Sequence, residues 1–324
     1  MHLLVTGGAG YIGSHFVSKA LENNFPKITV VDDLSTGLER RLPDLVEFEQ
    51  LDLADTSRTT RLTEILRDDV DAVVHFAAKK AVGESVVNPE RYFHDNIGGT
   101  INLLSAMRQA NVTNLIFSSS AAVYGEPDSA VVYETTPCNP INPYGQSKWV
   151  SELALENAAS AWGLTAIALR YFNVAGALNS SLADTTTSNL MPAIRNRITQ
   201  RKTLQIFGND YDTPDGTCIR DYIHILDLVD AHLVALRSLE PATNPGLNTY
   251  NVGTGFGSSV REIVSSFHDL PGVNLDYEYT ERRTGDPEAL TANVEKIATQ
   301  LSWRAKYNAS DIVESVVDNP PLQD

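Results

Sequence analysis

The sequence contains few cysteines and few basic residues, and it has no long apolar run. Its 324 residues include two cysteines, Cys138 and Cys218, too few to staple a chain of this size, which implies a reducing, cytoplasmic environment. Lysine and arginine number 25 against 41 acidic residues, and this net charge of −16 argues against a nucleic-acid partner. No apolar stretch approaches the roughly 20 residues of a membrane span. These absences leave small anions, held by a few local bases, as candidate ligands.

Metal-ligand spacing is also lacking. His15, His75 and His224 have no partner at the intervals that metal sites use, and neither do the two cysteines. We therefore expect packing or surface roles for these histidines, and no metal.

Hydrophobic residues make up 42% of the chain, and in its first half they form short β-branched runs that alternate with helical patterns. The expected strands are Leu3–Thr6, Ile28–Asp32, Val46–Gln50, Ala72–Phe76, Leu115–Ser118 and Thr165–Leu169. The expected helices are Tyr11–Glu22, Thr60–Arg67, Tyr92–Gln109 and Tyr144–Trp162. Several strands are almost entirely apolar, which indicates a parallel sheet covered on both faces. Right-handed crossovers make such a sheet doubly wound, so the predicted fold class is α/β, of Rossmann type.

The pattern changes after about residue 172. Polar loops interrupt it, and short strands and helices mix. A Rossmann domain over residues 1–172 is therefore expected to precede a smaller mixed α/β substrate-binding lobe over 173–324. Segments at about 217–252 are candidates for a return to the first domain.

A glycine-rich turn joins the first expected strand to the first expected helix. Residues 5–13 are Val-Thr-Gly-Gly-Ala-Gly-Tyr-Ile-Gly. A pyrophosphate must approach backbone amides at a helix amino terminus, where any Cβ would obstruct it. A glycine motif alone also suits an ordinary tight turn, but its place between a strand and a helix predicts a dinucleotide site. The expected contacts are Gly7, Gly10, Tyr11, Ile12 and Gly13.

The residues at the ends of the next strands indicate which dinucleotide binds. Asp32 closes the second strand about 20 residues after the glycine turn, where an acid takes the ribose hydroxyls. Asp33 follows, and no arginine is adjacent to receive a 2′-phosphate, which favours NAD over NADP. Asp52 and Leu53, just past the third strand, are placed to flank the adenine, although Asp52 equally suits a solvated turn.

Tyr144 and Lys148 lie one helical turn apart, so the phenol and the ammonium share a face. A free tyrosine titrates near pH 10, but an adjacent ammonium and the positive nicotinamide ring of NAD⁺ favour the phenolate. Each unit by which the pKa falls corresponds to about 1.4 kcal/mol, and the fall brings a phenol into general-base range. A Tyr-x-x-x-Lys pattern by itself is more often a surface pair than a catalytic pair. Other residues are therefore needed to distinguish the two.

Three serines, Ser118-Ser119-Ser120, follow a strand upstream of that pair. Ser120 is placed to hydrogen-bond the substrate hydroxyl that Tyr144 deprotonates. Ser118 is expected to be a turn or backbone partner beside the cofactor. The glycine turn, the serine and the Tyr-x-x-x-Lys pattern together are much more specific than any one of them, and they predict Ser120, Tyr144 and Lys148 as catalytic residues.

Further motifs extend along nearly the whole chain. They are His75–Ala78, Val82–Ser85, Ser118–Gly125, Pro143–Lys148, Arg170–Asn173, Ile206–Tyr211, Asp215–Thr217, Arg220–His224, Arg282–Asp286 and Leu301–Trp303. With these motifs the chain resembles the extended short-chain dehydrogenase/reductase superfamily and, within it, the UDP-glucose 4-epimerases. The matches in the second lobe matter most, because they concern a nucleotide sugar and not the shared cofactor fold.

The resemblance implies cofactor contacts beyond the glycine turn. They are Phe76, Ala77, Lys80, Asn96, Tyr144, Lys148 and Phe172. Lys80 is expected near the phosphates or the nicotinamide of NAD.

The resemblance also implies the residues that hold a UDP-sugar. They are Ser120 and Tyr144 at the 4-hydroxyl, Asn173, Asn189 and Leu190 at the diphosphate, Gln205, Ile206 and Phe207 along the uracil, Arg220 and Arg283 on the diphosphate oxygens, Tyr222 among the substrate contacts, and Asp286 on a ribose hydroxyl. Two guanidiniums suit a doubly charged diphosphate better than mobile lysines. From the residues alone, structural ion pairs of Arg220 with Asp221 or of Arg283 with Asp286 stay open as the alternative.

Some positions depart from the usual pattern of that family. Gly98 and Ala122 stand where many members carry an asparagine and a hydroxyl residue. Leu290 occupies the position where a tyrosine or a smaller residue sets the room for a 2-acetamido group, so acceptance of N-acetylated sugars stays open. The short Ser/Thr-rich loop at 179–188 makes the match onto Asn189 less secure.

The implied activity is reversible C4 epimerisation of a UDP-hexose in galactose metabolism, with tightly bound NAD and a homodimer formed by helix packing. One alternative is another NAD-dependent nucleotide-sugar epimerase or a dehydratase. A 4,6-dehydratase needs an acid beside the first hydroxyl residue, and here Ser120 is followed by Ala121 and Ala122. The other alternative is a catalytically idle NAD-sensing regulator, against which the intact Ser120, Tyr144 and Lys148 weigh.

Overall fold

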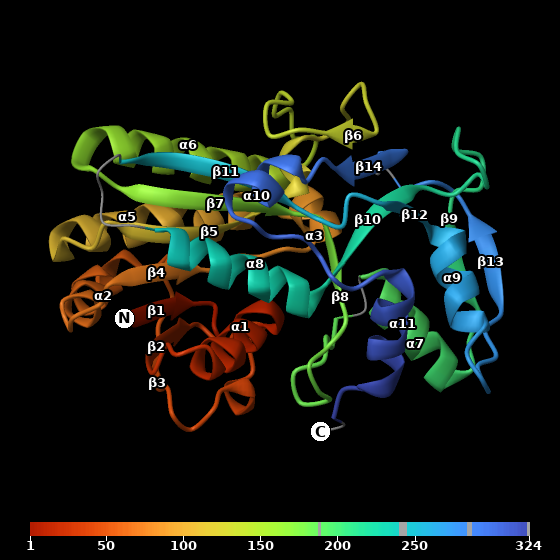
Figure 1. Cartoon of the computed structure of the whole chain (residues 1–324), viewed down its shortest axis with the longest axis horizontal. Coiled ribbons are helices and arrows are strands. Elements are labelled where there is room, and N and C mark those ends of the chain that lie inside the picture. The colour runs from red at the N-terminus through yellow and green to blue at the C-terminus, as the bar shows by residue number, and fades with distance from the viewer. Residues whose placement is uncertain (187–188, 240–244, 284–286, 323–324) are drawn as a thin grey trace. The chain divides into compact units, whose positions relative to one another are not determined.

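A computed structural model of the chain describes residues 1–186, 189–239, 245–283 and 287–322 (Figure 1). The chain forms two compact units. The first contains Met1–Gly125, Pro140–Arg170 and Val229–Tyr250, and the second contains Glu126–Asn139, Tyr171–Leu228 and Asn251–Asp324. Each unit thus collects segments that are distant in sequence, and the domain division at residue 172 stays a prediction.

A seven-stranded sheet in the order β11-β7-β5-β4-β1-β2-β3 forms the core of the first unit. Its strands are β1 (His2–Thr6), β2 (Lys27–Asp32), β3 (Glu47–Gln50), β4 (Ala72–His75), β5 (Asn114–Ser120), β7 (Thr165–Tyr171) and β11 (Gly246–Val252). The pairs β3-β2, β2-β1, β1-β4 and β4-β5 are all parallel. Because β1 lies between β2 and β4, the strand order reverses there, and the carboxyl ends of these strands form the switch point of a doubly wound sheet. The predicted α/β class of Rossmann type is confirmed.

Helices cover both faces of this sheet (Figure 1). They are α1 (Tyr11–Glu22), α2 (Thr59–Leu66), α3 (Val82–Val87), α4 (Pro89–Tyr92), α5 (Gly99–Ala110), α6 (Pro143–Trp162) and α8 (Ile225–Ser238), with 3-10 turns at Glu39–Arg41, Thr56–Arg58 and Ala121–Val123. Leu4, Val73 and Phe117 point from the sheet into one buried cluster with apolar residues of α2, α5 and α6. On the other face, α1 contacts α8, with the rings of Phe16 and His232 at 6.2 Å.

The predicted strands and helices of this unit agree with the structure, with one difference. The single helix predicted over Tyr92–Gln109 is divided into α4, a π-helical turn over Phe93–Gly98, and α5. A π-turn adds only about one residue to one helical turn, which is too little for apolar spacing to reveal. The turn buries Asn96, which becomes important for the cofactor site.

Among its described residues, the second unit contains small sheets and four helices. Its strands are β6 (Val131–Val132), β8 (Asn173–Ala175), β9 (Leu204–Phe207), β10 (Ile219–His224), β12 (Gly257–Ser259), β13 (Tyr277–Thr280) and β14 (Ala289–Ala292), and its helices are α7 (Leu190–Gln200), α9 (Val260–His268), α10 (Glu295–Gln300) and α11 (Ala309–Asp318). One sheet runs β12-β10-β14-β6, with β8 also paired to β10, and a separate ladder joins β13 to β9. Apolar residues of α7, α9 and α11 form its core with Leu204, Ile206 and Tyr222.

A buried carboxylate holds the centre of that larger sheet together. Asp221 on β10 accepts hydrogen bonds from the amides of Thr254, Gly255 and Ala292 and from the Thr254 hydroxyl. Burial raises the pKa of Asp221, and these donors offset part of the rise. Asp221 therefore fixes β10 beside β14, the strands that carry Arg220 and Leu290.

Within the described residues, no helix has the length and apolarity needed to cross a membrane. In the same part of the chain, no group of three or more His, Cys, Asp or Glu side chains is arranged to hold a metal ion.

Candidate active site

The glycine turn between β1 and α1 has the shape of a pyrophosphate cradle. Gly7 has a φ of +70°, and a Cβ there would collide with the backbone of Ala77. A Cβ at Gly13 would collide with the Gly7 carbonyl oxygen. At Gly10, by contrast, the nearest atom to a Cβ would be that same oxygen at 3.2 Å, so the space above Gly10 is otherwise open. The turn therefore leaves a cavity at Gly10 that a side chain would fill.

The amino terminus of α1 lies at this cradle. Gly10 is the N-cap, no described side chain caps the helix, and its first turn carries no acid. The helix dipole favours an anion there. Tyr11 and Ile12 begin the helix, and the ammonium of Lys80 lies 5.6 Å from the centroid of the Tyr11 ring. A dinucleotide pyrophosphate fits both the shape and the electrostatics.

The residues after β2 form a second wall of this site. Asp32 is buried, and its carboxylate accepts hydrogen bonds from the amides of Ala9 (3.0 Å) and Leu34 (2.9 Å). Burial raises its pKa, and the two amides offset part of that rise. Asp33 accepts from the amide (2.9 Å) and the hydroxyl (2.6 Å) of Ser35, and it pairs with Lys79 at 3.4 Å. The acids predicted for the ribose thus lie where β2 ends, with their loop held to the glycine turn.

The other predicted cofactor residues of the first unit lie along the carboxyl edge of the sheet. Phe76 follows β4, and its ring contacts those of Phe16 (5.4 Å) and His232 (4.9 Å). His232 in turn lies 3.1 Å from the Ser118 hydroxyl, across 114 residues of sequence. Ala77 contacts the glycine turn, as described for Gly7. These contacts build the floor of the crevice from β4, β5 and α8.

Two predicted adenine-side residues follow β3. Asp52 accepts a hydrogen bond from the amide of Ala54 at 2.8 Å, which is the turn geometry considered from sequence. Leu53 is buried, and its carbonyl accepts from Asn102 at 3.0 Å. Phe172, the remaining predicted cofactor contact, is a buried residue of the second unit.

Tyr144 and Ser120 are both buried residues of the first unit, and the Ser120 side chain acts on the Tyr144 phenol. Ser120 ends β5, and Tyr144 lies in the first turn of α6, which Asn142 caps through the amide of Gly145 (2.9 Å). Burial raises the pKa of Tyr144, and the hydrogen bond with Ser120 offsets part of the rise. This direction differs from the one expected from the Tyr144–Lys148 spacing, because spacing does not register desolvation.

Lys148 lies one turn further along α6 and is also buried. Its ammonium donates to the Ser118 carbonyl at 2.8 Å and lies 4.9 Å from the centroid of the Phe117 ring. Burial lowers its pKa to about 7, and the charge of Glu152 opposes this fall. The predicted serine, tyrosine and lysine are therefore gathered at the end of β5 and the start of α6.

A buried ionic network lies behind these residues. Glu152 accepts from the Ser119 hydroxyl at 2.5 Å and pairs with Arg170 at 2.5 Å. Arg170 also donates to the Tyr124 hydroxyl at 3.1 Å. Since Ser119 precedes Ser120 and Glu152 follows Lys148 on the same helix, the network holds β5 and α6 in register. Sequence reasoning missed Glu152; its i+4 spacing from Lys148 was the available signal.

In the second unit, the predicted substrate residues Arg220 and Tyr222 lie on β10, and Asn173 lies on the adjacent β8. Arg220 is buried, donates to its neighbour's carbonyl at 2.8 Å, and is paired in register with Leu290 of β14. Tyr222 is buried and is paired with Asn173 of β8, whose side chain is exposed. Arg220, a predicted diphosphate ligand, and Leu290, the position predicted to set the room for a 2-acetamido group, are therefore neighbours on adjacent strands.

The predicted uracil segment is the strand β9. Gln205 and Phe207 point outward, whereas Ile206 points into the core, as alternation along a strand requires. Any contact of Ile206 with a ligand therefore goes through its backbone. The guanidinium of Arg283 lies 4.0 Å from the Phe207 ring centroid, so the predicted arginine and aromatic residue lie together.

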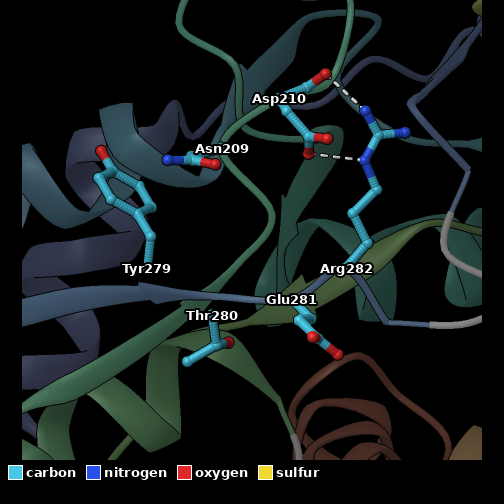
Figure 2. A pocket seen from close by; sticks show the side chains of 6 residues that line it. All are labelled: Asn209, Asp210, Tyr279, Thr280, Glu281 and Arg282. Carbon is cyan, nitrogen blue, oxygen red and sulfur yellow. Dashed lines mark hydrogen bonds and ion pairs between the residues drawn. The ribbon is translucent and has the colours of Figure 1, made fainter.

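A surface pocket of about 510 Å³ adjoins this segment (Figure 2). Arg282 donates to the side chain (2.7 Å) and the carbonyl (2.5 Å) of Asp210, and it stacks on Tyr211 at 4.2 Å. These bonds tie the loop after β9 to the end of β13.

Two further predicted substrate residues lie at the amino terminus of α7. Asn189 donates to the buried Asp184 at 2.9 Å, and Leu190 begins α7. Asp286 lies outside the described residues.

The fold and the site described above together indicate the class of protein to which the chain belongs. The family described as NAD dependent epimerase/dehydratase matches residues 3–253, so the chain belongs to it. NAD is accordingly the cofactor of this protein.

Three proteins similar to this chain are UDP-glucose 4-epimerases. The UDP-glucose 4-epimerase of Azospirillum brasilense is 42% identical over 321 residues, which cover 97% of this chain and 90% of that protein. The solved UDP-glucose 4-epimerase from Brucella ovis, in complex with NAD, is 40% identical with a TM-score of 0.91. The one from Bifidobacterium longum, in complex with NAD⁺ and UDP, is 35% identical with a TM-score of 0.90. Each structure covers 98% of this chain and 97% of its own. The resemblance predicted from sequence is confirmed.

Proposed function

We propose that this protein is an isomerase that interconverts UDP-galactose and UDP-glucose by inverting C4 of the hexose. The observation that carries this proposal is the placement of Ser120 at the end of β5, with Tyr144 and the buried Lys148 at the start of α6. The chain is aligned over almost its full length with UDP-glucose 4-epimerases. The family and the residues of the site therefore both support an enzyme that oxidises and then reduces a carbon atom of the sugar.

NAD, when bound, supplies reversible hydride acceptance at C4. Tyr144 takes the proton of the 4-hydroxyl through its phenolic oxygen, and Ser120 orients that hydroxyl by a hydrogen bond. Inversion requires the 4-keto sugar to present its other face before Tyr144 returns the proton. Arg220 and Arg283 are assigned to the diphosphate, where guanidiniums hold the nucleotide while the sugar turns.

The protonation of Tyr144 constrains this assignment. Burial raises its pKa, so the protein alone keeps the phenol protonated at neutral pH. The positive nicotinamide ring of bound NAD⁺ and the ammonium of Lys148 both favour the phenolate. Bound NAD⁺ therefore favours the base form of Tyr144 relative to the protein alone.

A nucleotide-sugar 4,6-dehydratase would share the first oxidation. Eliminating water needs an acid beside the hydroxyl residue, and Ala121 and Ala122 provide none. Epimerisation is therefore the better assignment.

An assay of the purified protein tests the proposal. UDP-galactose is supplied without added NAD, and UDP-glucose formation is followed by a coupled assay and by NMR. UDP-N-acetylgalactosamine is run alongside, to report on Leu290. Conversion of UDP-galactose to UDP-glucose is expected; oxidation of the sugar without epimer formation, or a dehydrated product, would overturn the proposal.

We also propose a homodimer. Exposed apolar side chains gather on α3, α5 and α6, among them Val87, Ile101 and Val150, and α5 contacts α6. A second copy of the same helices would cover them. Light scattering should give the mass of two chains, and Ile101→Glu should give one. Leu45→Glu, at a residue that is exposed elsewhere, is the control. A monomeric native protein would contradict the proposal.

We place the protein in the cytoplasm. Cys138 and Cys218 do not form a disulfide in the described part of the chain, which suits a reducing compartment. Secretion of the native protein from its source cells would contradict this placement.

A further inference from the structure

Two consecutive lysines follow β4 and extend to different walls of the cofactor crevice. Lys80 lies over the ring of Tyr11 at the start of α1. Lys79 reaches the loop after β2, where its ammonium donates to the Ser35 hydroxyl and pairs with Asp33 at 3.4 Å. The sequence separation between Lys79 and Asp33 is 46 residues. We call the contacts of Lys79, Asp33 and Ser35 the Lys79 bridge.

The backbone of Lys79 is held in place from the opposite side. Its amide donates to Asn96 Oδ1 at 2.8 Å, and its carbonyl accepts from Asn96 Nδ2 at 3.0 Å. The same amide nitrogen of Asn96 donates to Ser147 at 2.8 Å, on the helix that carries Tyr144. Because Asn96 is buried in the π-helical turn, the segment from which Lys79 extends is fixed.

The sheet topology determines what the Lys79 bridge crosses. Lys79 follows β4, and Asp33 and Ser35 follow β2, whereas β1 lies between these strands. The glycine turn begins at the end of β1. The loop after β2 is also bonded to that turn, through the amide of Leu38 and the carbonyl of Ala9 at 3.0 Å. The bridge therefore spans the end of β1 at the switch point, where the dinucleotide binds.

Burial distinguishes this ion pair from an ordinary surface pair. Exposed pairs contribute about 0–1 kcal/mol, because water and salt screen them. The Lys79 side chain is only 11% exposed, and that of Asp33 is 35% exposed. Burial acts to raise the pKa of Asp33, but hydrogen bonds from Ser35 and the charge of Lys79 hold it below its ordinary value. The Asp33 carboxyl is therefore charged at neutral pH.

We propose that Lys79 is a cofactor-retaining residue: its bridge to Asp33 and Ser35 closes the adenosine side of the crevice over bound NAD. The bridge has to open before NAD leaves. An epimerising cofactor is regenerated in each cycle and gains nothing from exchange, so slow release suits such an enzyme. The proposal concerns cofactor release alone and does not depend on which sugar is converted.

Release of labelled NAD tests the proposal without any sugar substrate. Native protein and variants are loaded with radiolabelled NAD and chased with excess unlabelled NAD, and the retained label is measured over time. Lys79→Met should accelerate release about tenfold, as expected for a lost hydrogen bond to a charged group. Asp33→Asn and Ser35→Ala should also accelerate release. Raising the salt concentration should accelerate release from the native protein but not from Lys79→Met.

A matched lysine provides the control. Lys27 begins β2 at the opposite end of the sheet and pairs with Asp68 at 3.1 Å. Lys27→Met removes the same charge and one ion pair, and it should leave the release rate unchanged.

The outcomes separate the bridge from other roles of Lys79. Unchanged release from Lys79→Met would overturn the proposal. Faster release from Lys79→Met with unchanged release from both Asp33→Asn and Ser35→Ala would also overturn it, because the ammonium would then act on the dinucleotide directly. If Lys79→Met fails to fold, Ser35→Ala, which loses only a hydroxyl, decides the question by the same measurement.

Discussion

Replacing Tyr144 with phenylalanine is expected to lower the rate of UDP-galactose epimerisation about 10³-fold while NAD stays bound. The substitution removes the one atom that takes and returns the proton of the 4-hydroxyl. The ring remains and continues to fill its buried position in the first turn of α6. The measurement is kcat from initial rates, together with the NAD content of the purified variant.

Tyr92→Phe is the matched control for that substitution. Tyr92 is fully buried, and its hydroxyl donates to the Ala81 carbonyl at 2.7 Å, outside the catalytic group. This variant should lose about 1 kcal/mol of stability and keep its turnover. Turnover of Tyr144→Phe within a few-fold of the native rate would exclude Tyr144 as the base. Loss of NAD from Tyr144→Phe would show that the phenol acts in cofactor binding instead.

Replacing Gly10 with valine is expected to abolish NAD binding while the protein stays folded. Gly10 has a φ of −73°, which valine adopts without strain, and a Cβ there meets only the Gly7 carbonyl oxygen at 3.2 Å. The added methyl groups occupy the cradle where the pyrophosphate meets the amides of α1. We expect affinity for NAD to fall at least about 100-fold by calorimetry, a loss of nearly 3 kcal/mol.

Two other glycines provide contrasts for Gly10. Gly13→Val should damage folding as well as binding, because its Cβ collides with the backbone of Gly7. Gly246→Val on β11 should do neither, since a Cβ there meets no atom within 4 Å. Circular dichroism and thermal unfolding separate these cases. If a well-folded Gly10→Val variant still binds NAD, the pyrophosphate does not bind at the glycine turn.

The charges near the cofactor explain how an acidic protein binds an anion. The net charge of −16 is a property of the whole surface. Around the crevice of the first unit, Lys79, Lys80 and Lys148 lie close to the sheet edge, with the positive end of α1. Local placement, not total charge, therefore determines which ligand binds.

Much of the first unit could be predicted from sequence because its signals are local. The apolar strands, the glycine turn, the acid at the end of β2 and the Tyr-x-x-x-Lys spacing each depend on residues close together in the chain. Local geometry determines them: a Cβ obstructs an anion, and i, i+4 residues share a helical face. Together they led to the fold class and the family.

Contacts between distant segments could not be predicted in this way. No arginine is adjacent to Asp33, but packing brings Lys79 to it from after β4. His232 reaches Ser118 from α8, because residues Val229–Tyr250 belong to the first unit. The π-turn that buries Asn96 leaves no mark on the apolar period.

The sequence by itself therefore determined the doubly wound fold and the family, and it predicted an NAD site and a catalytic group, since short-range stereochemistry encodes these signals. Tertiary structure decided the directions in which the pKa values of Tyr144 and Lys148 move, the support from Glu152 and Arg170, and the ion pair of Lys79 with Asp33. Each of these depends on desolvation or on partners brought together by packing. Burial and long-range proximity exist only in the folded chain.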